Sequence, residues 1–196
     1  GWELWSTDGT AAGTSVAADV YAGYGQPTSN YGPQYITSCN GKLFYAEYTG
    51  LYNLVAFDGT TGTPIWNNHL FPTNFACLNN SLFFQGQNYS GGTADYELWK
   101  SGGTQATTAL FADLYPGLIS GSTNGNSSSP ANLTVYNNKL YFTANNSTYG
   151  QELYSTDGTN APTVIDIYAG AIGSGPSYLR VYKGELWFKA NNASNG

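Results

Sequence analysis

Carboxylates recur at fixed places along this chain and are its first candidates for chemistry. Three sets stand at equivalent positions of a repeated pattern: Asp8, Asp58 and Asp157; Asp19, Asp113 and Asp166; and Glu3, Glu97 and Glu152. Paired carboxylates could hydrolyse a glycosidic bond, and oxygen-rich loops could hold calcium. The chain has no Asp-x-Asp-x-Asp run, and repetition by symmetry favours structural work, as turn caps and strand-edge bonds. We expect no cofactor, with calcium as the alternative.

Other catalytic chemistry has little support in the sequence. The single histidine, His69, stands where other copies of the pattern have aspartate, so we expect a turn or surface residue. A zinc site needs more than one histidine and two cysteines, and no Gly-x-Ser-x-Gly motif marks a nucleophile. The sequence therefore predicts no metal site and no catalytic residue, and the protein is not expected to be an enzyme.

Aromatic side chains offer a second kind of site, one that binds. Most of the five tryptophans should pack between sheets. Tyrosines that recur two residues after a shared aspartate, before a turn, are better placed to meet a ligand. These candidate ligand or turn positions are Asp19, Tyr21, Asp113, Tyr115, Asp166 and Tyr168.

All these residues belong to one pattern that occurs four times. Its signature, Glu-Leu-Trp-x-x-Asp-Gly-Thr in the fullest copy, begins at positions 3, 53, 97 and 152, at intervals of 50, 44 and 55 residues. Repeats of this length are typical of solenoids and propellers. We therefore treat residues 1–196 as one domain of four repeats.

Each repeat reads as four short strands. The signature is followed by a short apolar stretch, then an extended run, a two-residue turn and an alternating apolar run. The turns share residues that accept positive φ, namely Asn40-Gly41, Asn79-Asn80, Asn137-Asn138 and Lys183-Gly184. No window has a helical period, and Gly and Pro interrupt nearly every stretch. The pattern predicts an all-β fold, a β-propeller with four blades of four antiparallel strands.

The two ends of the chain bear on closure. The chain opens with the third strand of a blade and ends after the second strand of one, so the N- and C-terminal segments are expected to share a blade. Sharing would remove two open sheet edges. The alternative is one unit of a longer tandem array. Because the chain starts within a repeat and contains no Met, we interpret it as a segment of a longer precursor.

The first and last signatures, residues 3–10 and 152–159, resemble those of the ELWxxDGT repeat family of large secreted and surface proteins. The resemblance covers essentially the whole chain. Departures are Asn53 and Val55 in place of Glu and Trp, and Gly102 in place of Asp. The resemblance implies a propeller-like architecture and an extracellular location, and it carries no known active site.

The composition excludes several classes of protein and of binding partner. Charged residues make up 9% of the chain and aromatics 16%, the opposite of a disordered segment. A net charge of −6 with only six Lys and Arg cannot supply the basic face that nucleic acid needs. The longest apolar runs are strand-sized, so we expect no membrane span.

Cys39 and Cys77 lie near the ends of equivalent strands in adjacent repeats. We predict a disulfide between neighbouring blades, which an oxidising compartment favours; two buried free thiols are the alternative. Alignment of the turns offsets the two cysteines by one position. This offset would point their side chains to opposite faces unless a bulge intervenes.

Sequons for N-glycosylation are frequent, although a chain rich in Asn, Ser and Thr also produces them by chance. The candidates are Asn79, Asn88, Asn126, Asn132, Asn145, Asn146 and Asn192. We expect Asn88, Asn145, Asn146 and Asn192 in the same exposed loop of three repeats.

The sequence thus predicts a non-catalytic extracellular structural or adhesive module, a subunit of a filament, sheath or surface layer. Its partners would be further copies of itself or other extracellular proteins. The alternative is a lectin-like propeller that binds carbohydrate through the repeated Asp and Tyr positions.

Overall fold

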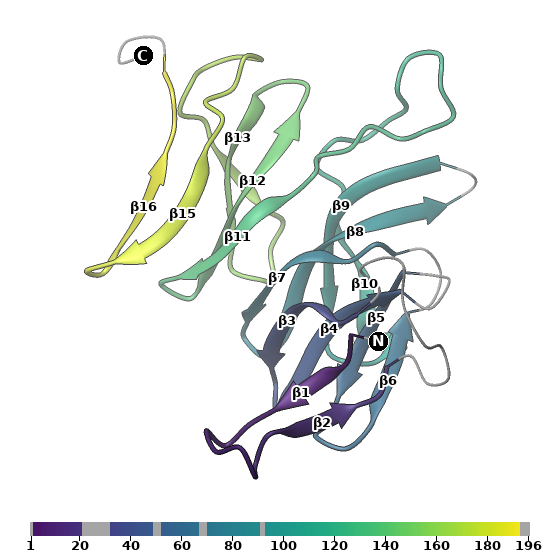
Figure 1. Ribbon diagram of the computed structural model, residues 1–196. Helices are drawn as coiled ribbons and strands as arrows, with labels where there is room; N and C mark the ends of the chain where they lie inside the picture. The colour runs from purple at the N-terminus through teal and green to yellow at the C-terminus, as the bar shows by residue number, and fades with distance from the viewer. Residues whose placement is uncertain (1, 21–31, 49–51, 67–69, 91–92, 193–196) are drawn as a thin grey trace.

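The computed structural model describes residues 2–20, 32–48, 52–66, 70–90 and 93–192 (Figure 1). Within these ranges the chain forms sixteen strands and one short 3-10 turn, η1 (Gln105–Thr107). The prediction of an all-β fold is confirmed. Helices long and apolar enough to cross a membrane do not occur in this part of the chain.

Three sheets have four antiparallel strands each, in sequence order. The first consists of β3 (Gln34–Cys39), β4 (Lys42–Tyr48), β5 (Tyr52–Phe57) and β6 (Gly62–Trp66). The second consists of β7 (Thr73–Leu78), β8 (Ser81–Ser90), β9 (Thr93–Ser101) and β10 (Thr108–Ala112). The third consists of β11 (Ala131–Tyr136), β12 (Lys139–Asn146), β13 (Gly150–Thr156) and β14 (Thr163–Ile165).

Two further sheets are hairpins of two strands. The N-terminal hairpin pairs β1 (Leu4–Ser6) with β2 (Ser15–Ala18). The C-terminal hairpin pairs β15 (Ser177–Tyr182) with β16 (Glu185–Lys189). By the order of the repeat, β15 and β16 are a first and second strand, whereas β1 and β2 are a third and fourth.

Turn chemistry explains why the first two strands of each repeat form a hairpin. At all four predicted two-residue turns, Asn40-Gly41, Asn79-Asn80, Asn137-Asn138 and Lys183-Gly184, φ lies between 46° and 76°. A type I′ turn needs positive φ at both central residues, and Asn and Gly accept it most readily. The sequence therefore placed these hairpins correctly.

Consecutive sheets pack face to face, and the same two faces always meet. Phe44 of the first sheet packs with Phe84 of the second in one cluster. Phe83 of the second sheet packs with Phe142 of the third in the next. Because successive residues of a strand point to opposite faces, Phe83 and Phe84 reach different clusters. Each sheet thus presents one face to the sheet before it and the other to the sheet after it.

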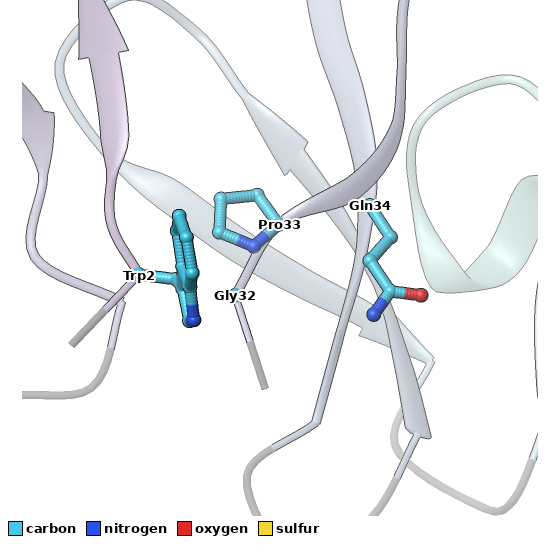
Figure 2. A pocket seen from close by; sticks show the side chains of 4 residues that line it. All are labelled: Trp2, Gly32, Pro33 and Gln34. Atoms are coloured by element: carbon cyan, nitrogen blue, oxygen red, sulfur yellow. The ribbon is translucent and has the colours of Figure 1, made fainter. Parts of the chain in front are cut away.

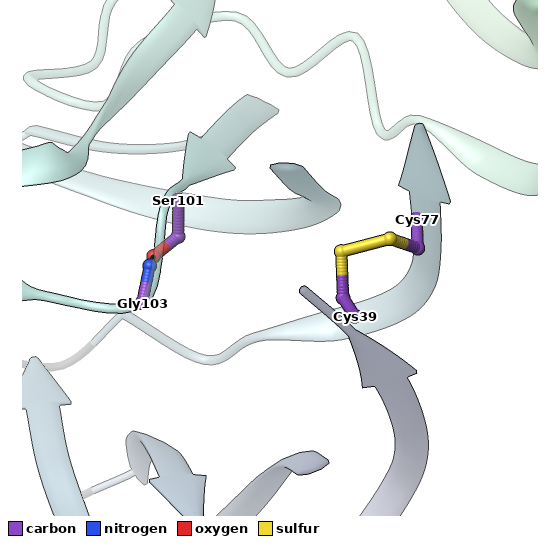
Figure 3. The surroundings of a disulfide bond; sticks show 4 residues. All are labelled: Cys39, Cys77, Ser101 and Gly103. Atoms are coloured by element: carbon purple, nitrogen blue, oxygen red, sulfur yellow. Dashed lines mark hydrogen bonds between the residues drawn. A yellow bond between two sulfur atoms is a disulfide. The ribbon is translucent and has the colours of Figure 1, made fainter. Parts of the chain in front are cut away.

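The predicted disulfide is present between Cys39 at the end of β3 and Cys77 in β7, with Cα atoms 5.4 Å apart (Figure 3). The one-residue offset was expected to point the two side chains apart, but it does not oppose this bond. β3 and β7 belong to adjacent sheets whose opposite faces meet. Facing side chains must therefore come from positions of opposite parity, and the offset supplies them.

The terminal segments do not share a blade in this structure, contrary to the prediction. The two hairpins form separate sheets and lie at the two ends of the arrangement (Figure 1). Each is seated on its own neighbour: Leu4 packs with Tyr45 and Val55 of the first complete sheet, and β15 contacts β11 of the third. In the described part of the chain the sheets do not close into a ring. Closure would require β16 to pair with β1, and these strands belong to separate sheets.

Candidate functional site

The first strand of every repeat carries the same irregularity. Pairing of β3, β7, β11 and β15 with the following strand shifts register at one equivalent place in each. The residue two positions after a proline there has left-handed φ: Tyr35 (55°), Asn74 (56°), Asn132 (56°) and Tyr178 (58°). Non-glycine residues in this conformation are strained and occur preferentially at functional positions.

These bulges surround a hollow of about 370 Å³ to which all four first strands contribute. We call it the axial pocket. Its lining includes Tyr35, Phe75, Asn74 and Asn132, with Arg180 from β15. The Tyr35 and Phe75 ring centroids lie 5.9 Å apart. Amide groups, a guanidinium and two aromatic rings around one hollow can hydrogen-bond and stack on a polar ligand such as a sugar.

The sequence reasoning missed the axial pocket, although its signal is present in the chain. A proline stands two residues before each bulged residue, including Pro72 before Asn74 in the divergent second repeat. Tyr or Asn at this spacing could have been noticed. The convergence of these residues on one hollow could not have been predicted, because it depends on how four sheets are arranged.

Two signature glutamates, Glu97 and Glu152, hold the segment that follows their own sheet. Glu97 accepts hydrogen bonds from the Leu114 amide (2.8 Å), the Ser128 amide (2.8 Å) and the Ser128 hydroxyl (2.5 Å). Glu152 accepts the matching bonds from Ser174. Both glutamates are fully buried. Their position agrees with the predicted strand-edge bond and leaves their oxygens occupied.

Burial raises the pKa of Glu97 to about 7, because the charged form loses solvation. Hydrogen bonds from Ser128 and Leu114 favour the charged form and act against this effect. Burial likewise raises the pKa of Tyr154 to about 12. A raised pKa suits a general acid, yet here it belongs to a carboxyl enclosed by backbone amides.

The signature aspartates cap turns, as predicted. Asp58 accepts the amides of Thr60 and Thr61, and Asp157 accepts those of Thr159 and Asn160, at 2.8–2.9 Å. These amide bonds hold the pKa of Asp58 and of Asp157 at about 2. Asp8 makes the same type of turn, since its Oδ1 accepts the Thr10 amide at 2.9 Å.

The third repeat, where Gly102 replaces the aspartate, builds its turn differently. Here η1 closes the loop, and the Gly102 amide donates to the Thr107 carbonyl at 3.2 Å. Ser101, at the end of β9, accepts the Gly103 amide at 3.0 Å (Figure 3). The loss of Asp is thus compensated by backbone and hydroxyl bonds.

The predicted Asp and Tyr ligand positions do not gather in one place. Asp19, Asp113 and Asp166 are exposed and follow the last strands of three different sheets. Asp113 borders a hollow of about 490 Å³ between the second and third sheets. Tyr115 and Tyr168 are half-buried at their separate turns. Tyr21 lies outside the described residues, as does His69.

The side chains of the sequon asparagines differ in the hydrogen bonds that they make. The side-chain amide of Asn146 donates to the Leu114 carbonyl at 2.7 Å, and that of Asn126 donates to Pro116 at 3.3 Å. Asn132 lines the axial pocket and donates to Thr143 at 3.3 Å. Asn79 is exposed in its turn and donates to the Asp157 carbonyl at 3.2 Å.

The sequence predicted the remaining sequons in one exposed loop, and the structure does not place them there. Asn145 and Asn146 end strand β12 and are half-buried, and Asn88 falls within strand β8. Asn192, also half-buried, is the last residue that the structure describes. The strands extend further than the apolar run suggested, because backbone pairing continues through polar residues.

Among the described residues, no three His, Cys, Asp or Glu side chains gather as ligands of a metal ion would. Comparison with known proteins adds no assignment, since no protein-family model matches the chain and no curated protein is similar in sequence. The resemblance to ELWxxDGT repeats therefore stays a prediction drawn from the repeated residues.

Proposed function

We propose that this chain is a non-catalytic extracellular structural or adhesive module of the ELWxxDGT propeller type, and that it assembles with further copies into a filament, sheath or surface layer. One observation carries the proposal. Aromatic side chains are exposed on both terminal hairpins, at 60% for Trp5, 56% for Trp187, 71% for Tyr178 and 58% for Tyr182. Aromatic side chains are enriched at protein–protein interfaces relative to the rest of the surface.

Two further features support this function. The repeated carboxylates considered above as candidates for catalysis accept hydrogen bonds within turns and between segments, as Asp157 and Glu152 illustrate. The Cys39–Cys77 disulfide favours an oxidising compartment such as the cell exterior. Both features suit a durable scaffold.

The test is negative-stain electron microscopy and sizing of the native material, with an intact mass measured on the same sample. Ordered fibres or sheets are expected, and attached glycan would raise the mass above the 20.9 kDa of the bare chain. A monodisperse particle of the bare chain mass would contradict the structural role.

The axial pocket favours carbohydrate binding as the second candidate. Tyr35 and Phe75 offer ring faces, and Asn74 offers a side-chain amide beside them. A glycan array followed by calorimetry would test it, with Tyr35→Ala as the disabling variant and Tyr168→Ala, at a turn that does not line the pocket, as the matched control. Binding that Tyr35→Ala leaves unchanged would exclude the pocket.

A further inference from the structure

The second and third strands of the three complete sheets pair in one common register. Leu43 lies opposite Phe57, Leu82 opposite Ser101 and Leu140 opposite Thr156. In every case the third-strand residue is the fifth of its repeat signature. The register is therefore a property of the repeat.

Two residues after each of these leucines, the register places two side chains opposite one another in the core. Phe84 faces Trp99, and Phe142 faces Tyr154 with ring centroids 5.7 Å apart. All four of these side chains are at most 6% exposed. Pairs of large apolar side chains directly opposite one another on neighbouring strands stabilise a sheet.

The two terminal hairpins divide the same arrangement between them. Phe188 on β16 is equivalent to Phe142, and Trp5 on β1 is equivalent to Tyr154. Without a partner strand, Phe188 is 38% exposed and Trp5 60% exposed. Each hairpin therefore holds half of a core pair that every complete sheet buries.

We propose that β16 of one copy pairs antiparallel with β1 of a second copy, which completes a fourth sheet in the order β15, β16, β1, β2. The inference rests on the proposed function and names its partner, a second copy of this chain. The common register places Trp187 opposite Ser6 and Phe188 opposite Trp5. Phe188 and Trp5 then stack as Phe142 and Tyr154 do.

Charge is complementary across this contact. Of the six basic residues of the chain, three lie on the C-terminal hairpin: Arg180, Lys183 and Lys189. The N-terminal hairpin, residues 2–20, has three acidic residues and no basic one. Opposite potentials guide the two ends together and disfavour contact between two identical ends.

An apolar hollow lies beside Trp2, which precedes β1. Trp2, Gly32, Pro33 and Gln34 line about 230 Å³ there (Figure 2). Gly32 approaches Trp2 so closely that a Cβ at position 32 would lie 2.2 Å from the Trp2 Cβ, so any other residue there would displace Trp2. The common register brings Asn191 of the incoming copy opposite Trp2. The end of the added strand therefore reaches this hollow.

The geometry favours another copy over the chain's own far end. The hairpins lie at opposite ends of the arrangement, each packed on a different sheet (Figure 1). Because the two surfaces differ, every copy that docks leaves one of each kind free. Such heterologous contacts propagate into open filaments unless they close into a ring.

Cysteine cross-linking in mixed samples tests the pairing directly. Chains carrying Ser6→Cys are mixed with chains carrying Trp187→Cys and oxidised, and the products are separated on non-reducing gels. Directly opposite positions meet the distance that a disulfide needs. We expect cross-linked dimers from this mixture. Ser6→Cys mixed with Glu185→Cys, two positions out of register on the same face, should give at least ten-fold less.

The second test uses a variant that stops the growth of the assembly. Trp5→Asp alters an exposed side chain, so the protein should still fold, while its N-terminal hairpin should no longer accept a second copy. Added in equal amount to the unmodified protein, it should shorten the assemblies at least two-fold. Far-ultraviolet circular dichroism verifies its fold.

Three outcomes would overturn the pairing. Cross-linked monomers from the Ser6→Cys/Trp187→Cys double variant, without cross-links in the mixture, would show that the chain closes its own ring. If fibres form but the cross-link does not, the pairing of β16 with β1 is wrong and the proposed structural role stands. Monodisperse, uncross-linked protein would reject both.

Discussion

The Glu97 carboxylate accepts hydrogen bonds from both the backbone amide and the hydroxyl of Ser128, 31 residues further along the chain. Glu152 and Ser174 repeat this arrangement in the next sheet. A buried carboxylate thereby fixes the path of the segment that leads from one sheet to the next. Removal of one partner would leave buried polar groups unsatisfied, which is costly.

This arrangement predicts a specific pH dependence of stability. Burial raises the pKa of Glu97 from 4.5 to about 7, so the folded state holds a proton that the unfolded state has lost in this range. The free energy of unfolding should therefore fall by about 3 kcal/mol as pH rises from 4.5 to 7. Urea denaturation across this range measures it.

Glu97→Gln should flatten that profile, because glutamine does not titrate. Glu185→Gln on the exposed end of β16 is the control and should keep the slope. If Glu97→Gln retained the full slope, another group would be responsible.

The disulfide should contribute substantially to stability. It joins residues separated by 38 positions, and a cross-link of that length reduces the entropy of the unfolded chain by an amount worth about 4 kcal/mol. Cys39→Ser/Cys77→Ser should lower the free energy of unfolding by this order, measured in urea. Chemically reduced native protein should match the variant. A loss below about 1 kcal/mol would mean that packing alone holds β3 against β7.

Bulge residues should tolerate glycine better than a branched side chain. Asn132 has φ 56°, a region that costs a β-branched residue about 1–2 kcal/mol. Asn132→Val should lower the free energy of unfolding by at least this amount. Asn132→Gly should lose less, although it also gives up the bond to Thr143. Equal losses in the two variants would show that the hydrogen bond, not the backbone conformation, dominates.

The turn aspartates should remain ionised in mild acid. Amides of Asn160 and Thr159 hold the pKa of Asp157 at about 2, below its usual 3.8. The stability that this carboxylate provides is complete above pH 3.8 and disappears as pH falls through 2. Carbon-13 NMR of the Asp157 carboxyl should show a midpoint near 2, and Asp157→Asn should remove that signal. A midpoint near 4 would contradict the capping role.

Much of the fold could be read from the chain because its signals are local. Asn137 and Asn138 adopt positive φ, which Asn accepts more readily than most residues, so this pair between two apolar runs favours a hairpin turn. The disulfide between Cys39 and Cys77 was also expected. Its geometry was judged wrongly, because strand parity was compared within one sheet and not across two facing sheets.

The sites were harder to foresee. Asp113 and Asp166 are equivalent in the repeat and were predicted as ligand positions, yet they lie at separate turns of separate sheets. The axial pocket arises where first strands converge, so Asn74 and Arg180 line one hollow only after four sheets are placed. Similarity along the sequence identifies equivalent places, not neighbouring ones.

The sequence by itself determined the all-β class and the positions of the hairpin turns, because each depends on side chains a few residues apart. Tertiary structure decided which faces meet, which carboxylates are buried, and that β1 and β16 are left at separate edges. Those outcomes depend on contacts between residues far apart in the chain. The physical reason is that a strand specifies how it pairs, whereas the position of the sheets decides which partner it reaches.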